Sequence, residues 1–172
     1  SLPMPSLEEL IAKLEAIEEI KRLKAFYAKC ADEKYTDDHQ RLPQDEVNRV
    51  ARDQVSVFTE DAVWDGGPDF GRFEGKEAIY ENLRNGPWKF TVHMFLLPLI
   101  EVEGDTGTGR WTIWETATLA ESNTPIFLAA TVDEKYVKVD GRWLICNVVQ
   151  TNRFMTPFDQ PWTINRNAPY KP

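Results

Sequence analysis

The 172-residue sequence has few of the residues that usually build metal centres and disulfides. It contains two cysteines, Cys30 and Cys146, and two histidines, His39 and His93. The cysteines lie in separate apolar segments without CxxC spacing, and no His, Cys and carboxylate cluster has metal-ligand spacing. The two thiols could pair, but we expect buried free thiols in a cytoplasmic protein and no metal site.

Long apolar runs and an excess of basic residues are also absent. No run approaches the ~20 residues of a membrane-spanning helix. Residues 1–6 lack the basic start and apolar centre of a signal peptide, although the first residue, Ser1, leaves a removed leader open. The formal net charge of −8 disfavours nucleic acid and anionic membrane surfaces as partners. Walker, GxGxxG and GxSxG motifs are missing, so we expect a soluble protein without a cofactor.

The first third of the chain has the pattern of two helices. Ser6 and Glu9 form a capping-box signature at a helix N-terminus. Apolar residues then recur at spacings of three and four: Leu7, Leu10, Leu14, Ile17, Ile20, Leu23, Tyr27 and Cys30. This stripe predicts a long amphipathic helix that ends near Asp32. A second helix is predicted over residues 45–58.

The remainder is rich in strand signals. A short strand at 62–64 ends in a turn cluster, and a short helix is expected over 75–83. Four strands follow, at 92–102, 109–119, 126–139 and 143–154. Asp140-Gly141 between the last two is typical of a type I′ hairpin turn. Helices followed by a meandering antiparallel sheet predict an α+β fold in one domain, residues 1–172, with irregular ends at 1–5 and about 158–172.

Apolar residues occupy both alternating sets of residues 92–97. Phe95 and Leu97 belong to one set, and Val92, Met94 and Leu96 to the other. An antiparallel sheet with one wet face should alternate apolar and polar residues, so both faces are expected to be covered. Helices would cover one face. A second subunit would cover the other, which predicts a homo-oligomer, unless the C-terminal tail covers it instead.

His93 is the most informative candidate for chemistry, because its strand position directs an imidazole to the same side as Phe95. It could act as a general base or be a core histidine with satisfied hydrogen bonds. Asp32, at the end of the first helix, could be solvated or could reach His93. In the second case its carboxylate would fix the imidazole tautomer and stabilise the imidazolium.

Other side chains could bind or polarise a substrate. Tyr27 lies on the apolar stripe, where its hydroxyl could stabilise a developing oxyanion or simply fill the core. Trp64, Phe95 and Trp111 are candidates for lining a cavity, although tryptophan more often fills a core or an interface. Arg153 could bind a carboxylate or sit at the rim in an ion pair.

Several segments together resemble the SnoaL-like family. Residues 17–24 with Tyr27, Cys30 and Asp32 resemble that family's opening helix. Matching stretches are also found at residues 58–64, 73–79, 92–94, 108–111 and 136–143. The likeness is greatest to bile acid 7-alpha-dehydratases, and it extends more distantly to hexachlorocyclohexane dehydrochlorinase and scytalone dehydratase. It covers most of the chain up to about Pro157.

The resemblance implies a nuclear-transport-factor-2-type cone, with a strongly curved antiparallel or mixed sheet wrapped around N-terminal helices and an internal apolar pocket. In dehydratase-like members an Asp–His pair acts as the base, and Asp32 and His93 fall at those positions. Tyr27 matches a tyrosine of the bile acid enzymes, while Arg153 falls one residue from the register of their arginine. The resemblance also suggests a trimer or dimer.

These observations favour a cofactor-independent lyase of the dehydratase type, acting on a hydrophobic, polycyclic or aromatic substrate. His93 and Asp32 would remove a proton and water would be lost, with Tyr27 assisting. Two alternatives stay open: an isomerase or cyclase of the ketosteroid or polyketide type, and a non-catalytic module that binds a hydrophobic ligand.

Overall fold

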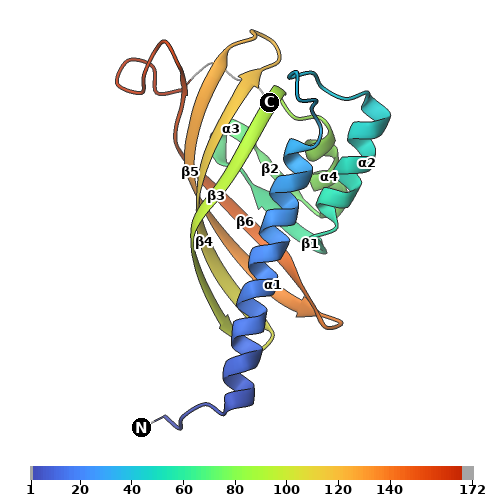
Figure 1. The fold of residues 1–172 in the computed structure, drawn as a ribbon, viewed down its shortest axis with the longest axis vertical. Coiled ribbons are helices and arrows are strands. Elements are labelled where there is room, and N and C mark those ends of the chain that lie inside the picture. Colours follow the sequence, from blue (N-terminus) through green and yellow to red (C-terminus); the bar gives the residue numbers. More distant parts are fainter. Residues whose placement is uncertain (1, 168–172) are drawn as a thin grey trace.

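The computed structural model describes residues 2–167. Its first element is a long helix, α1 (Leu7–Asp32), which begins at a complete capping box between Ser6 and Glu9. The buried part of the predicted apolar stripe starts only at Ile20 and continues with Tyr27 and Cys30. Earlier apolar residues such as Leu7 and Leu14 are exposed, because the first turns project beyond the sheet (Figure 1).

A small layer of helices and short strands follows α1. It consists of α2 (Gln44–Val55), β1 (Phe58–Asp65), α3 (Gly67–Phe70), β2 (Arg72–Glu74) and α4 (Lys76–Arg84). The predicted second helix is confirmed but ends earlier than expected, because residue 58 already begins β1. Helices α2 and α4 pack against each other beside the upper half of α1 (Figure 1).

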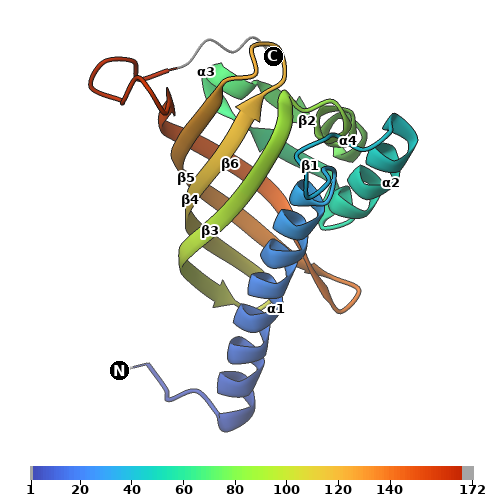
Figure 2. The ribbon, with the colours of Figure 1, turned by 45° about the horizontal axis from the view of Figure 1, so that its top comes forward.

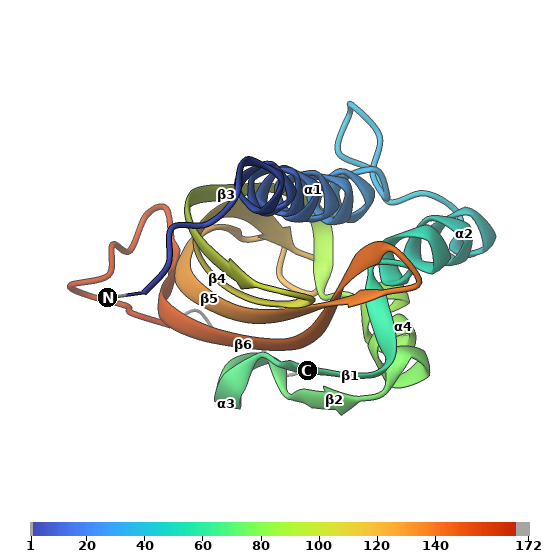
Figure 3. The same cartoon turned by 90° about the horizontal axis from the view of Figure 1, so that it is seen from below.

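Four long strands form most of the sheet: β3 (Trp88–Glu103), β4 (Thr106–Leu119), β5 (Pro125–Val139) and β6 (Arg142–Pro157). The strand order is β2-β1-β6-β5-β4-β3, with β1 parallel to β6 and the other pairs antiparallel. The sheet curves strongly without closing (Figure 2), and α1 lies across its concave side next to β3 (Figure 3). The predicted α+β cone is confirmed, and the sheet is mixed.

The hairpin between β5 and β6 follows from its two turn residues. Asp140 and Gly141 both have positive φ angles, 50° and 79°, as a type I′ turn requires. Val139 pairs with Arg142 directly across this turn. The turn therefore fixes which residues of β5 and β6 face the concave side.

Strand β3 departs from simple alternation at Leu97. The register with β4 shifts between Leu96 and Leu99, and Leu97 has a φ of 52°. Leu97 is consequently 75% exposed instead of sharing the inner side with Phe95. The prediction for Leu97 was wrong, because a β-bulge re-aims the side chains beyond it.

The segment after β6 covers part of the convex side of the sheet. Phe158 stacks on Phe127 with ring centroids 3.9 Å apart, and Trp162 stacks on Phe154 at 4.9 Å. The C-terminal segment thus supplies the alternative cover for this region of the second face. Turns and bends make up most of residues 158–167, and the remainder of the predicted irregular tail, 168–172, lies outside the described residues.

Both cysteines are free. Cys30 is buried as expected, whereas Cys146 is only partly buried, because its strand position faces away from the core. Within residues 2–167, no helix is long and apolar enough to cross a membrane.

Candidate active site

The end of α1 brings Asp32 against His93 in β3. The Asp32 Oδ1 atom lies 2.8 Å from His93 Nδ1 and also accepts the His93 backbone N–H at 3.1 Å. A carboxylate at a helix C-terminus faces the negative end of the helix dipole, so these two N–H groups compensate an unfavourable position. The contact fixes a proton on Nδ1 and leaves Nε2 as the basic nitrogen.

A second carboxylate lies on the other side of the same imidazole. Glu115 Oε1 is 3.2 Å from His93 Nε2, and the Thr91 hydroxyl donates to that oxygen at 2.7 Å. The Glu115 side chain is 4% exposed, and that of His93 is 13% exposed. His93 is therefore held between an Asp at one ring nitrogen and a Glu at the other.

Burial and the neighbouring charges change the pKa values of both His93 and Glu115. Burial lowers the pKa of His93, but the Glu115 charge and the Asp32 hydrogen bond outweigh it, so the net pKa is raised. Burial also raises the pKa of Glu115, against the opposing effects of His93 and Thr91. Each of the two groups consequently holds its proton to higher pH than it would in water.

Sequence reasoning missed Glu115. Its position is nevertheless encoded, because Trp111 and Ile113 occupy the same alternating face of β4 and are buried. A glutamate in that inward set is unusual and marks a functional candidate. It pairs across the strands directly with His93, a register that only the structure specifies.

Tyr27 extends from α1 into the same cavity and is 8% exposed. Burial raises the pKa of its hydroxyl well above the ordinary value, and the charges of Glu134 and Glu115 act in the same direction. Side-chain hydrogen bonds from Trp64 and Gln54 oppose the increase. Tyr27 is thus kept neutral, and its hydroxyl is a hydrogen-bond donor rather than a ready source of protons.

The cavity itself encloses about 100 Å³ and opens toward the surface. Trp64 and Phe95 line it, together with His93 and Tyr27. Its walls are less purely apolar than the resemblance implied, because Lys34 and Glu115 also contribute to the lining. The space combines aromatic surfaces with a few ionisable groups, which is typical of a small-molecule site.

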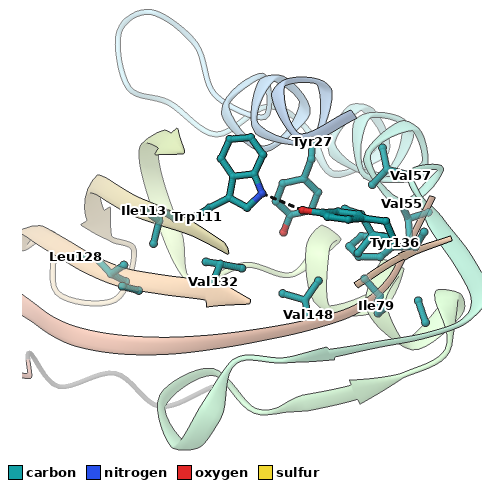
Figure 4. Close-up of a cluster of buried hydrophobic side chains, with 14 of the residues drawn as sticks. Tyr27, Val55, Val57, Ile79, Trp111, Ile113, Leu128, Val132, Tyr136 and Val148 are labelled. Atoms are coloured by element: carbon teal, nitrogen blue, oxygen red, sulfur yellow. Dashed lines mark hydrogen bonds between the residues drawn. The ribbon is translucent and has the colours of Figure 1, made fainter. Parts of the chain in front are cut away.

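Two of the predicted substrate-binding residues lie elsewhere. Trp111 is buried behind the lining, where it packs edge-on against Phe95 and donates its ring N–H to Tyr136 at 3.0 Å (Figure 4). Arg153 is exposed at an irregularity between β5 and β6, which pair Ala129 with Phe154 but Ala130 with Asn152. This bulge turns Arg153 away from the cavity and gives no support for a substrate-binding role.

A buried ion pair supports the base of the site. Lys24 of α1 is 2.7 Å from Glu134 of β5, and both side chains are at most 4% exposed. The Tyr136 hydroxyl donates to Glu134 at 2.8 Å, and the Lys24 ammonium lies 4.0 Å from the centre of the Phe95 ring. The network therefore fixes α1, and with it Tyr27, relative to the sheet.

Two basic residues border the mouth of the cavity. Lys34 donates to the Leu83 carbonyl at 2.7 Å, and Arg41 donates to the Arg84 carbonyl at 2.6 Å. Both contacts tie the segment after α1 to the C-terminus of α4, whose carbonyls lack helical partners. Across residues 2–167 no group of three or more His, Cys, Asp or Glu residues is placed to hold a metal.

Comparison with known proteins is consistent with this fold. The model of the SnoaL-like domain matches residues 48–149, more than half of the chain. The chain belongs to the SnoaL-like family. This SnoaL-like protein has no match among curated proteins.

Solved structures resemble the SnoaL-like protein closely in fold. A type 2 hexachlorocyclohexane dehydrochlorinase aligns with a TM-score of 0.71 at 20% identity, covering 84% of this chain and 90% of that one. A type 3 hexachlorocyclohexane dehydrochlorinase from Novosphingobium barchaimii LL02 gives 0.70 at 21% identity, covering 84% and 91%. A protein named as a candidate scytalone dehydratase from Novosphingobium aromaticivorans gives 0.69 at 17% identity, covering 84% and 89%.

Proposed function

We propose that this SnoaL-like protein is a cofactor-independent carbon–oxygen lyase that removes water from a largely apolar substrate containing a ring. The observation that carries the proposal is the His93 imidazole, 2.8 Å from Asp32 and 3.2 Å from Glu115 at the wall of a cavity. A base, a group that orients it and a second acid–base group are what an elimination requires.

The proposed reaction begins with neutral His93 and protonated Glu115. His93 Nε2 removes a proton from a carbon next to a carbonyl group, and the freed electron pair forms a carbon–carbon double bond. The hydroxyl on the neighbouring carbon leaves as water with a proton from Glu115. The proton on Nε2 then passes to Glu115, 3.2 Å away, which restores both groups. Asp32 stabilises the imidazolium in the intermediate stage.

Tyr27 would act by hydrogen bonding. Its raised pKa makes proton transfer unfavourable, but its O–H can donate to an oxygen that gains negative charge, either the enolate or the leaving oxygen. The hydrogen bond from such a donor becomes stronger as negative charge develops on the substrate oxygen. It therefore lowers the reaction barrier more than it favours substrate binding.

The size of the cavity limits how much of the substrate it can enclose. An engineered apolar cavity of about 150 Å³ accepts benzene. A space of about 100 Å³ is smaller, so it holds at most one ring at the reacting end, with the rest of the molecule directed to the opening. The names of the structural neighbours, a dehydrochlorinase of a cyclohexane and a candidate dehydratase, agree with elimination from ring compounds.

The proposal is tested with 3-hydroxycyclohexanone, a single-ring β-hydroxy ketone that yields 2-cyclohexenone and water. We expect the wild-type protein to form 2-cyclohexenone, followed by absorbance and mass spectrometry. His93→Ala should lower the rate by about 100-fold or more, because it removes the base. His39→Ala is the matched control, since His39 does not line the cavity.

Full activity in a folded His93→Ala variant would contradict the proposal, as would absence of product with the wild type. An isomerised ketone without loss of water would favour the isomerase alternative. Binding that survives in His93→Ala without any turnover by the wild type would favour the binding-module alternative.

We also propose that residues 1–172 act as one domain and that the protein is a cytoplasmic homo-oligomer. The free thiols support a reducing compartment. Oligomerisation is supported by an apolar strip on the outer side of edge strand β3, formed by Val92, Met94, Leu96, Leu97 and Leu99, each at least 37% exposed. A second copy of the chain would cover this strip.

A further inference from the structure

Gln54 is a buried polar residue that the proposed reaction does not use. It lies on the inward face of α2 with Val47, Val50, Ala51 and Val55, and it is 1% exposed. Its side chain lines the cavity. Within the described residues, Gln54 Oε1 is the one buried side-chain nitrogen or oxygen atom of a non-exposed residue without a hydrogen-bond partner.

An unpaired carbonyl oxygen in this position is costly. Burying such an acceptor without a donor destabilises a protein, because the hydrogen bond that the oxygen made to water is lost and not replaced. An aliphatic side chain at position 54 would match the rest of the α2 face and avoid the cost. A ligand in the cavity that donates a hydrogen bond to the Gln54 oxygen would offset this destabilisation.

Tyr27 complements Gln54. Burial raises the pKa of the Tyr27 hydroxyl, and hydrogen bonding to the Trp64 and Gln54 side chains acts in the opposite direction. Tyr27 and Gln54 both line the cavity, where the O–H of a neutral tyrosine can donate to a bound molecule. Gln54 Oε1 and the Tyr27 O–H thus offer one acceptor and one donor from neighbouring side chains.

This combination matches an alcohol. A hydroxyl group donates one hydrogen bond and accepts others, whereas an ether or a carbonyl only accepts, and an organic chloride does neither well. A chloride or ether beside Gln54 would leave the buried oxygen unpaired, so binding discriminates against both.

We propose that Gln54 Oε1 and the Tyr27 hydroxyl form a hydroxyl-selecting subsite that holds the leaving group of the substrate. The inference rests on the proposed elimination and deepens it, because it makes an alcohol the substrate and water the leaving molecule. Tyr27 donates to the leaving oxygen, and Gln54 accepts the hydrogen that this oxygen carries. Gln54 is therefore a specificity-determining residue, and the enolate requires a different donor.

The subsite is tested by binding, without turnover. Phenol, anisole, chlorobenzene and benzene have one ring each: phenol donates and accepts a hydrogen bond, anisole only accepts, and the other two do neither well. Isothermal titration calorimetry of the wild-type protein should show phenol binding about tenfold more tightly than benzene and chlorobenzene, because one satisfied hydrogen bond is worth about 1.4 kcal/mol. Anisole should fall between phenol and benzene, since it can accept from Tyr27.

Two substitutions separate the two contacts. Gln54→Met keeps the length of the side chain but removes the acceptor, so it should abolish the preference for phenol over anisole and leave benzene binding unchanged. Tyr27→Phe should weaken phenol and anisole together. Gln44→Met, at the exposed start of the same helix, is the control and should leave all four affinities unchanged.

Equal affinity of the wild type for phenol and chlorobenzene, or no binding of phenol, would overturn the inference, and this comparison needs no variant. A phenol preference that persists in folded Gln54→Met would overturn it too. These outcomes are distinct from failure of the proposed reaction: a protein without lyase activity can still select phenol, and an active lyase without selection would refute only the subsite.

Discussion

Lys34 places an ammonium group in the cavity wall, where burial lowers its pKa to about 7 and the charge of Arg41 acts in the same direction. Between pH 7 and the ordinary lysine pKa of 10.5, the unfolded chain binds one more proton than the folded protein. The contribution of Lys34 to stability therefore rises with pH across this interval and is lowest below pH 7.

We predict that the Lys34→Met substitution favours the folded state most strongly at low pH. The free energy of unfolding of the variant minus that of the wild type should be largest below pH 7 and should decrease by a few kcal/mol toward pH 10, at about 1.4 kcal/mol per unit of pKa shift. Urea unfolding at several pH values measures the difference. A difference independent of pH would mean that Lys34 keeps an ordinary pKa.

The site residues differ in how far the sequence could specify them. The residues alone left open whether Asp32 reaches His93, and the pairing was implied by the resemblance to dehydratase-like proteins. Glu115 could be recognised only as an inward-facing acid, since its contact with His93 depends on the register of β3 and β4. Arg153 was left open between substrate binding and the rim, because the β-bulge that exposes it has no signal of its own in the sequence.

At the scale of elements, the Lys24–Glu134 pair attaches α1 to β5 in the interior. We predict that Lys24→Met or Glu134→Gln lowers the free energy of unfolding by about 3–5 kcal/mol, because each leaves one buried charge or its hydrogen-bond partners uncompensated. The double substitution should cost less than the sum of the two, as a double-mutant cycle in urea would show.

Lys21→Met is the matched control for this cycle. Lys21 lies one turn earlier on α1 and pairs with Glu18 in solvent, with side chains 44% and 61% exposed. An exposed pair of this kind is worth about 0–1 kcal/mol. A loss as small for Lys24→Met as for Lys21→Met would show that the buried network does not hold α1 in place.

Helices and strands with strong local signals were predictable. The capping box at Ser6 begins α1, and Asp140-Gly141 supplies the positive φ angles of the last hairpin. Leu97 was not predictable in this way, because its left-handed backbone conformation is unfavourable for leucine and occurs where the register of β3 and β4 shifts. The exposed first turns of α1 also escaped prediction, since an apolar stripe does not reveal where its covering partner ends.

At the scale of the whole molecule, two regions of the convex side of the sheet differ in whether another part of the chain covers them. The C-terminal segment covers Phe127 and Phe154, whereas the outer strip of β3 has no cover among residues 2–167. Whether a tail or a subunit covers an apolar face depends on tertiary placement, which explains why the sequence left both possibilities open.

We predict that the wild-type protein is larger than a monomer and that combining Met94→Glu with Leu96→Glu shifts it to the monomer, because two carboxylates would be buried at the contact. Size-exclusion chromatography with light scattering measures the mass. Val139→Glu, an equivalent change at an exposed hairpin end, is the control. A monomeric wild type, or an unchanged mass in the doubly substituted protein, would contradict the proposed interface.

The central claim is that His93 is a proton acceptor held between two carboxylates. The direct measurement is ¹⁵N NMR of the His93 imidazole across pH, in the wild type and in Asp32→Asn and Glu115→Gln. We predict a pKa above 6.5 in the wild type, a proton on Nδ1 in the neutral form, and a lower pKa in each variant. A pKa at or below the ordinary value that neither substitution changes would contradict the account.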